Sequence, residues 1–173
     1  MRGAQTALQR ELSSVRTGRA SPALVDNISV DYYGAPTPLN QLASITSPEA
    51  RLLVIQPWDR QSIGAVERAL LKSDLGITPN NDGTVIRLTL PTPTAERRKE
   101  LVRVVRKRVE DGRVAVRNVR RDVQDKLRAM ERAKELSQDD MHRAQERLQQ
   151  LTDFSIGQID DIGAAKEAEV LEG

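Results

Sequence analysis

Residues 94–130 read TAERRKELVRVVRKRVEDGRVAVRNVRRDVQDKLRAM. Apolar or small residues recur in this stretch at steps of three and four, which is the spacing of one face of an α-helix. They are Leu101, Val105, Val109, Gly112, Val116, Val119, Val123, Leu127 and Met130. Thr94 and the acidic Glu96 are typical of a helix start. The stretch therefore predicts one long amphipathic helix, whose apolar face requires partner helices.

A second long helix is predicted after a short break. Ser137 and Asp140 have the S-x-x-D spacing of a helix cap. Beyond the cap, apolar and small residues again follow a helical spacing: Met141, Ala144, Leu148, Leu151, Ser155, Ile159, Ile162 and Ala165. Gly157 and Gly163 fall within this helix, and we expect each to interrupt it at a cost of about 1 kcal/mol relative to Ala.

A third, shorter helix is predicted over residues 4–17, where Leu8, Leu12 and Val15 share one face. Three helices with narrow apolar stripes favour an antiparallel bundle. At 1.5 Å per residue the two long helices would extend roughly 50–60 Å, and the first only about 20–25 Å. We therefore expect part of the bundle to lack its third helix, because the chain begins late relative to the partner helices through truncation or a shifted start.

The residues between the first and second of these helices predict a different kind of structure. Alternating or continuous apolar residues predict strands over residues 25–33, 52–55 and 85–90. A helical pattern covers residues 61–72. Proline and glycine predict a stiff turn at residues 34–38, and a further turn is predicted at residues 80–83.

The predicted fold class is α+β. An antiparallel three-helix bundle comprises residues 1–18 and 94–173, and a small β/α/β domain comprising residues 23–92 is inserted into it. The two connections between these domains, residues 18–22 and 91–94, lie next to each other in this arrangement. Two adjacent strand-like linkers predict a hinge.

Composition excludes several classes of function. The 173-residue chain has no cysteine, which excludes disulfides and thiolate sites, and its single His142 excludes a paired-histidine zinc motif. Aromatic residues make up 2% of the chain, so base stacking on a ring platform is not expected, and we interpret Tyr32, Tyr33 and Trp58 as core or half-buried residues. Apolar runs are too short to span a membrane, and the N-terminus lacks a signal-peptide pattern. We expect a soluble, cytoplasmic protein that is not an enzyme and has no cofactor, metal site or catalytic residues.

The net charge of +2 hides an uneven distribution along the chain. Residues 97–135 carry 15 basic and 7 acidic side chains, a net charge of +8. Residues 136–173 carry 3 basic and 9 acidic side chains, a net charge of −6. This asymmetry indicates either an anionic partner or ion pairs between helices.

The basic side chains of the long helix include a stripe of arginines: Arg106, Arg113, Arg117 and Arg120, widened by Arg121 and Arg128. The first four fall within about 60° of one another, roughly 100° from the centre of the apolar face. Asp111 and Asp122 point to the far side. Arginine outnumbers lysine by ten to three in residues 97–128, and its planar fork suits phosphate groups. We favour nucleic-acid binding through backbone phosphates. The alternative is a solvated face whose arginines form ion pairs within the helix or with the acidic last helix.

Five motifs follow one another along the chain: RTGRASP at residues 16–22, YYGAPTPL at residues 32–39, DLGI with Pro79-Asn80 at residues 74–80, TAERRK at residues 94–99 and RVAVRNVRRD at residues 113–122. Together they resemble the bacterial ribosome recycling factor family over nearly the whole chain. Two features depart from the family. The chain begins later than family members usually do, and Gly157 and Gly163 stand where the family more often has good helix formers.

The resemblance implies an L-shaped protein of tRNA-like dimensions that binds the large ribosomal subunit after termination. With elongation factor G, which hydrolyses GTP, it would split the ribosome into subunits, and initiation factor three would then keep the subunits apart. We expect a monomer with no membrane contact.

The resemblance also assigns roles to residues of this chain. The implied ribosomal RNA-binding residues are Arg113, Arg117, Arg120 and Arg121, with Arg16 and Arg19 near the elbow, and Arg106 and Arg128 extend this set along the stripe. The implied hinge consists of Gly18, Arg19, Ala20, Ser21 and Pro22 together with Pro91, Thr92, Pro93 and Thr94. The bundle tip, around residues 134–140, would point toward the peptidyl transferase region.

Two alternative functions from other classes remain. One is a coiled-coil adaptor that binds an acidic protein. The other is a metal-dependent nuclease that uses the acidic last helix, with Asp160, Asp161, Glu167 and Glu169 as its carboxylates. We interpret these carboxylates as solvated surface, because no convergent turn or second ligand set accompanies them.

Overall fold

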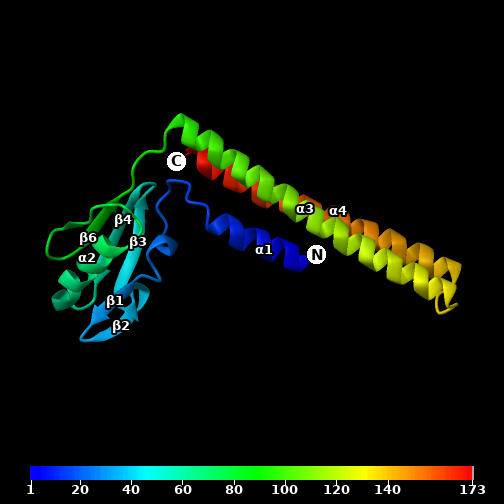
Figure 1. Ribbon diagram of the computed structural model, residues 1–173, viewed down its shortest axis with the longest axis horizontal. Helices are drawn as coiled ribbons and strands as arrows, with labels where there is room; N and C mark the ends of the chain where they lie inside the picture. The colour runs from blue at the N-terminus through cyan, green and yellow to red at the C-terminus, as the bar shows by residue number, and fades with distance from the viewer. Residues whose placement is uncertain (173) are drawn as a thin grey trace. The chain divides into compact units, whose positions relative to one another are not determined.

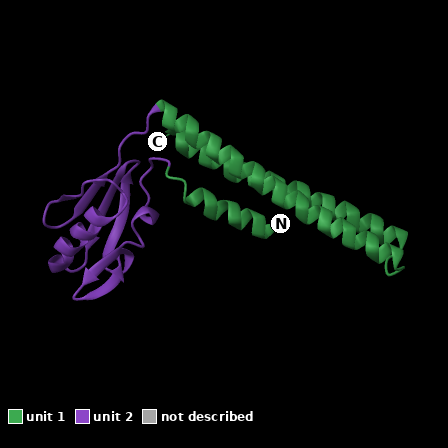
Figure 2. Ribbon diagram, viewed as in Figure 1, with its two compact units in different colours: residues 1–16, 95–172 green, residues 17–94, 173 purple. Residues whose placement is uncertain are grey.

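The computed structural model describes residues 1–172 (Figure 1). Gly173, the last residue of the predicted bundle domain, lies outside the described residues. The chain divides into two compact units, which we call the bundle unit (Met1–Arg16 and Ala95–Glu172) and the sheet unit (Thr17–Thr94) (Figure 2). Long helices together with a small sheet region confirm the predicted α+β class.

The bundle unit consists of α1 (Arg2–Ser13), α3 (Ala95–Arg132) and α4 (Gln138–Glu172). Helices α3 and α4 lie side by side and run in opposite directions (Figure 1). The predicted cap at the start of α4 is confirmed, because the Asp140 backbone N–H donates to Ser137 Oγ at 3.1 Å. Helix α1 ends before the predicted residue 17. The hydroxyls of Ser13 and Ser14 donate to the carbonyls of Arg10 and Glu11, each at 2.6 Å, and serine that bonds local backbone in this way favours helix ends.

The apolar face of α3 is buried over only part of its length. We call residues 95–117 the proximal half of α3 and residues 118–132 the distal half. In the proximal half, Leu101, Val105, Val109, Gly112 and Val116 are buried. In the distal half, Val119, Val123 and Leu127 are half-buried, and Met130 is 38% exposed. The twelve-residue α1 packs Leu8 and Leu12 into the proximal core with Val105, Val109, Val116 and Ile159. Burial is therefore deepest where three helices meet.

Helix α4 passes through both of its glycines without interruption, so the prediction that they break the helix is wrong. Gly163 is buried, and a Cβ added there would lie 2.5 Å from Cγ2 of Val109. Gly112 of α3 lies against Leu8 and Ile159, each 3.5 Å from the position of an added Cβ. Gly163 therefore allows an approach of α3 and α4 that a larger residue would prevent, whereas the distances at Gly112 are those of ordinary packing. Gly157 instead faces open space.

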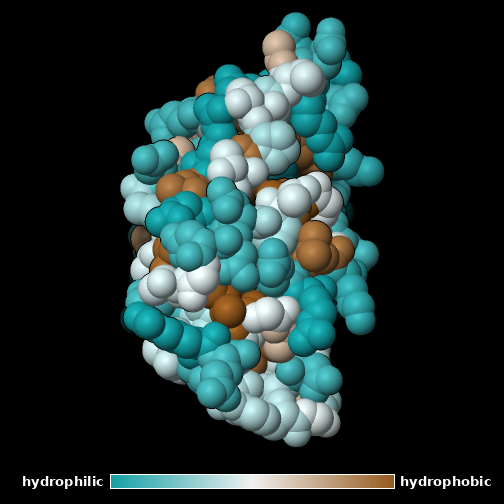
Figure 3. Space-filling view, turned by 90° about the vertical axis from the view of Figure 1, so that its left-hand side faces the viewer, coloured by the Kyte–Doolittle hydropathy of each residue, from teal (hydrophilic) through white to brown (hydrophobic). Residues whose placement is uncertain are grey.

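The sheet unit contains a two-stranded and a four-stranded antiparallel sheet. The first pairs β1 (Ser29–Tyr32) with β2 (Ala35–Pro38). The second has the order β3 (Ala43–Glu49), β4 (Leu52–Pro57), β6 (Ile86–Thr89), β5 (Asn80–Asn81). The helix α2 (Ile63–Lys72) contributes Val66 and Leu70 to an aliphatic core shared with β1, β4 and β6. Seen from the side of the sheet unit, hydrophobic residues form small separate patches on a hydrophilic surface (Figure 3).

Several predictions for this unit are corrected. Residues 35–38 form a strand, not a turn; their two prolines are tolerated because β2 lies at a sheet edge, where a missing N–H breaks no ladder. Strand β3 was not predicted, since its ASITSPE sequence is mostly polar. The strand predicted from Val25 begins at Ser29, because a 3₁₀ turn over Pro22–Leu24 precedes it. Asn80 and Asn81 pair with β6 before the turn.

The aromatic residues are only partly as predicted. Tyr32 is half-buried against the sheet-unit core. Tyr33 is 74% exposed and Trp58 is 68% exposed, so the prediction of core or half-buried positions is wrong for both. Tyr33 occupies the tight turn between β1 and β2, and Trp58 follows the last residue of β4. At both positions the chain has left the sheet.

Candidate nucleic-acid interface

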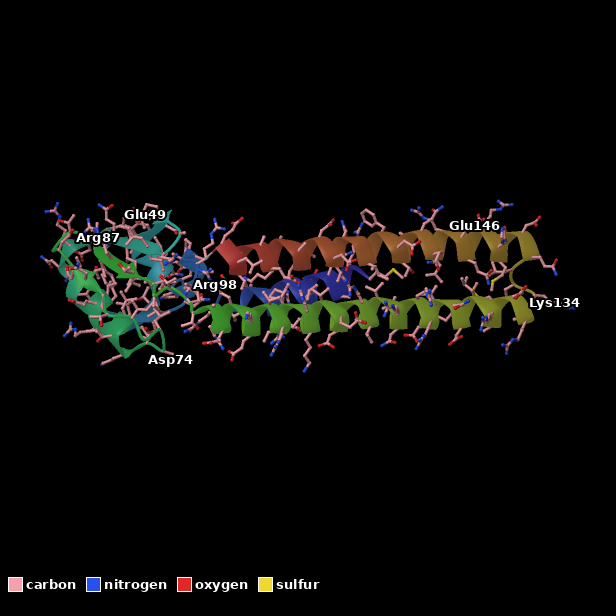
Figure 4. The ribbon with its side chains drawn as sticks, turned by 90° about the horizontal axis from the view of Figure 1, so that it is seen from above. Glu49, Asp74, Arg87, Arg98, Lys134 and Glu146 are labelled. Carbon is pink, nitrogen blue, oxygen red and sulfur yellow. The ribbon has the colours of Figure 1, made fainter. Side chains whose placement is uncertain are left out.

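The six arginines of the predicted stripe all lie on α3, and we call them the arginine surface: Arg106, Arg113, Arg117, Arg120, Arg121 and Arg128. The two long helices carry dense charged side chains from Arg98, near the start of α3, to Lys134 in the connection that follows it (Figure 4). The structure divides the arginine surface into two groups by what faces each guanidinium.

Two proximal arginines bind carboxylates of α4. Arg106 donates from Nε and Nη2 to the two carboxylate oxygens of Glu167, both at 3.1 Å, which is a bidentate pair. Arg113 donates to Asp160 Oδ1 from Nε at 2.8 Å and approaches it from Nη2 at 2.7 Å. These hydrogen bonds raise the pKa of both guanidinium groups above the usual value for arginine. For these residues the alternative of pairing with the acidic last helix is correct.

Glu110 adds a third carboxylate, on α3 itself. It accepts hydrogen bonds from Arg113 Nη1 at 3.0 Å and from Arg117 Nη1 at 3.3 Å. The bond from Arg113 is the main cause that lowers the pKa of Glu110. Glu110 was not predicted from the sequence, where only Asp111 and Asp122 were considered and both were placed on the far side of the helix. Its spacing of three residues from Arg113 was the available signal.

The distal arginines have different surroundings. Over residues 1–172, no ion pair is found for Arg120, Arg121 or Arg128. Nε of Arg120 is buried and has no hydrogen-bond partner in the described part of the chain. Arg120 also lines a groove of about 260 Å³ between α3 and α4, together with Gln124, Leu148 and two further glutamines, Gln145 and Gln149. A buried donor without a partner is unusual, and the groove beside it is lined mainly by polar side chains.

Arg16 and Arg19 belong to different units. Arg16 is the last residue of the first bundle-unit segment, and Arg19 is a residue of the sheet unit. Only Arg16 therefore shares a unit with the arginine surface.

The two linkers share one anchor within the sheet unit, the turn between β3 and β4. The Ala20 N–H donates to the carbonyl of Ala50 at 2.6 Å, and the Leu90 N–H donates to the carbonyl of Arg51 at 2.8 Å. The Arg51 side chain donates to the hydroxyl of Thr92. Gly18 has a φ of +83°, and a Cβ there would lie 2.6 Å from Cγ of Pro93. The linkers touch each other, and glycine is required at this contact.

The residues considered as catalytic candidates do not lie together in one site. The His142 side chain is 74% exposed and lies 3.2 Å from Glu146 of the same helix. Asp160 and Glu167 are engaged by arginines. Within residues 1–172 no group of histidine and carboxylate side chains is arranged to hold a metal ion. No helix in that range is sufficiently long and apolar to cross a membrane.

These features define a class of α+β proteins in which a long, arginine-rich helix bundle is joined to a small sheet unit. Residues 8–171 match the family model described as ribosome recycling factor. The chain is 56% identical over 172 residues to the ribosome-recycling factor of Halalkalibacterium halodurans, covering 99% of this chain and 93% of the relative. It is 54% identical over 169 residues to that of Listeria welshimeri, covering 98% and 91%.

Two solved structures are similar as well. A solution structure of the ribosome recycling factor matches with a TM-score of 0.76 and 43% identity, covering 99% of this chain and 91% of that one. A Thermus thermophilus factor described with Escherichia coli elongation factor G on the post-termination complex matches with a TM-score of 0.65 and 44% identity, covering 98% and 92%. The chain belongs to the ribosome recycling factor family, whose members are translation factors and not enzymes.

Proposed function

We propose that this protein acts on the post-termination ribosome with elongation factor G and holds the large subunit through the distal arginines of α3. Family membership supports the recycling role, and so does the similar Thermus thermophilus factor, which is described with elongation factor G on the post-termination complex. The observation that carries the site is the contrast between the proximal arginines, which face carboxylates, and Arg120, Arg121 and Arg128, for which no pair is found in residues 1–172.

Phosphate chemistry explains why the distal arginines are the stronger candidates. An arginine that already binds a carboxylate has fewer free N–H groups for a phosphate, and the carboxylate beside it repels the phosphate charge. An arginine without such a pair can present its fork directly to phosphate oxygens. Binding of this kind releases counterions, so affinity for ribosomal RNA falls steeply with salt. Arg106, Arg113 and Arg117 contribute long-range attraction, while Arg16 and Arg19 add phosphate contacts near the linkers.

The remaining steps concern the linkers and the partners. The protein acts as a monomer in the cytoplasm, and its sheet unit moves about the hinge of residues 18–22 and 91–94 when elongation factor G acts. This movement turns binding into separation of the subunits, after which initiation factor three keeps them apart. The shared anchor of both linkers on Ala50 and Arg51 supports movement of the sheet unit as one body.

Co-sedimentation with purified large subunits tests the RNA-binding site. We expect Arg120→Glu and Arg121→Glu to weaken binding at physiological salt at least about tenfold, since each loses a phosphate contact and adds repulsion. The control compares substitutions of equal charge: Arg106→Gln, which removes a guanidinium already paired with Glu167, should weaken binding less than Arg120→Gln does. Unchanged binding by both distal variants would contradict the site. An adaptor for an acidic protein would not bind large subunits at all.

Gly18→Ala tests the hinge separately. The added methyl group meets Pro93 and a backbone conformation that favours glycine, so it alters the contact between the linkers. We expect slower subunit splitting with elongation factor G and GTP, while co-sedimentation with large subunits stays unchanged. Splitting at the normal rate would show that this linker contact is not needed.

A further inference from the structure

The sheet unit carries two large aromatic side chains on its surface. The whole chain has only one Trp, two Tyr and one Phe, yet Tyr33 is 74% exposed and Trp58 is 68% exposed. Exposed Trp and Tyr are the residues that most often dominate the energy of protein–protein interfaces. We call Tyr33, Trp58 and the neighbouring Asp31 and Asp59 the aromatic surface.

Tyr33 is held in an unfavourable backbone conformation. With φ values of +50° and +84°, Tyr33 and Gly34 form the two-residue turn between β1 and β2. Turns of this type favour Asn or Gly at the first position, and a bulky residue there is strained. Strain of this kind is concentrated at functional positions. A requirement of the turn itself would be met better by asparagine, so the tyrosine side chain needs another explanation.

Asp59 fixes the ring of Tyr33. The phenol hydroxyl donates to Asp59 Oδ2 at 3.1 Å, and this bond raises the pKa of Tyr33. The rings of Tyr32 and Tyr33 meet edge to face, with centroids 4.6 Å apart. The exposed ring is thus preorganised, which lowers the entropy lost when a partner binds it.

The aromatic surface lies at the end of the sheet unit that is remote from the linkers. The linkers are anchored at Ala50 and Arg51, just before β4 begins, and Trp58 and Asp59 follow the other end of that strand. The β1–β2 hairpin lies at the same remote end (Figure 1). The entering and leaving chain segments therefore do not cover these residues.

The charges around the rings select the class of partner. Asp31 and Asp59 supply two carboxylates, and Arg60 is the basic residue that follows Asp59 in the sequence. A net negative surface disfavours the phosphate groups of RNA, in contrast to the arginine surface of α3. Aromatic faces beside carboxylates favour guanidinium and ammonium groups. We propose that the aromatic surface binds a segment of a protein partner rich in Arg or Lys. This inference rests on the proposed function in one respect: it seeks the partner among the proteins present at the ribosome with elongation factor G.

A photo-crosslink tests the class of partner. The full chain with benzoylphenylalanine at position 58 is irradiated with post-termination ribosomes and elongation factor G. We expect an adduct to a protein chain that resists ribonuclease and contains an Arg- or Lys-rich peptide by mass spectrometry. The control carries the same group at position 71, where Leu71 of α2 is 58% exposed. An adduct to RNA, or a yield no greater than at position 71, overturns the inference.

A variant in this crosslinking background tests Tyr33. Because Tyr33→Asn suits the turn, the variant should fold at least as stably as the parent. We expect the ribosome concentration for half-maximal crosslinking to rise about tenfold, the effect of losing one interface anchor. The control Leu71→Ala should leave this ribosome concentration unchanged. An unchanged value for Tyr33→Asn overturns the role of its ring. Co-sedimentation with large subunits separates the two proposals. If the protein binds large subunits but gives no protein adduct, only this inference fails. If the protein does not bind large subunits, the proposed function fails too.

Discussion

The two halves of α3 share an apolar stripe and several arginines but have different surroundings. In the proximal half, three helices bury Val105, Val109 and Val116, and carboxylates of α4 bind two of the arginines. In the distal half, two helices leave the apolar side chains half-buried, and no ion pair is found for the arginines Arg120, Arg121 and Arg128 over residues 1–172. The role of an arginine in the stripe therefore depends on what faces it. The proximal half pairs two of its arginines within the bundle, and the distal half is where we propose that RNA binds.

The largest difference between the halves should appear in core truncations. Leu8 of α1 is 2% exposed and packs against Gly112 and Ile159. We expect Leu8→Ala to lower the free energy of unfolding by about 2–5 kcal/mol. Leu127→Ala, at a half-buried distal position, should cost about 1 kcal/mol, since less apolar area is lost from the core. Urea denaturation measures both values. Equal losses would mean that α1 adds no packing to the proximal half.

The two glycines of α4 provide a second contrast, because replacing them by alanine should change stability in opposite directions. Gly163→Ala would place a methyl group 2.5 Å from Cγ2 of Val109, a stiff β-branched side chain. We expect a loss of about 1–3 kcal/mol from overpacking. Gly157→Ala meets open space and should stabilise the helix by roughly 0.5–1 kcal/mol.

A double variant identifies the cause of the Gly163 effect. Combining Gly163→Ala with Val109→Ala removes the clash, so the two losses should not add. Additive losses in denaturation experiments would show that Gly163 matters for a reason other than its contact with Val109.

Much of the fold was predictable because it depends on local patterns. The two long helices follow from apolar spacing, and the start of α4 follows from Ser137 and its cap. The structure differs where tertiary contacts overrule local preference. Strand β2 forms despite two prolines because its edge position needs no N–H there. Gly163 is a weak helix former that the close approach of Val109 requires.

The candidate site was predictable in its position but not in its internal division. Helical geometry places the arginines on one side of α3, whichever fold surrounds them. Which of them meet carboxylates depends on the register of α3 against α4, and no local pattern determines that register. Glu110 is the exception, because residues three apart on a helix are neighbours. The exposure of Tyr33 and Trp58 likewise depends on where strands end.

Paired and unpaired arginines should give opposite results in stability and binding. Arg113→Gln breaks the pair with Asp160, and because the two side chains are 33% and 45% exposed, we expect a loss of only about 0.2–1 kcal/mol. Arg120→Gln breaks no ion pair found in the described residues, so stability should stay within about 0.5 kcal/mol. Co-sedimentation with large subunits should weaken more for Arg120→Gln. If both variants lose stability equally, the division of the arginine surface is incorrect.

The smallest expected effect is a change in the titration of Glu110. The hydrogen bond from Arg113 lowers the pKa of this carboxyl, so Arg113→Gln should raise that pKa back toward the usual value for glutamate. Because the folded-state pKa is the lower one, the ion pairs of Glu110 contribute fully above the unfolded pKa, and their contribution is lost as pH falls through the folded value. Carboxyl NMR titration measures the shift. Arg120→Gln is the control: it removes a charge from the same helix but not from Glu110. An equal shift in both variants would mean that the net charge of α3, and not the contact with Arg113, sets this pKa.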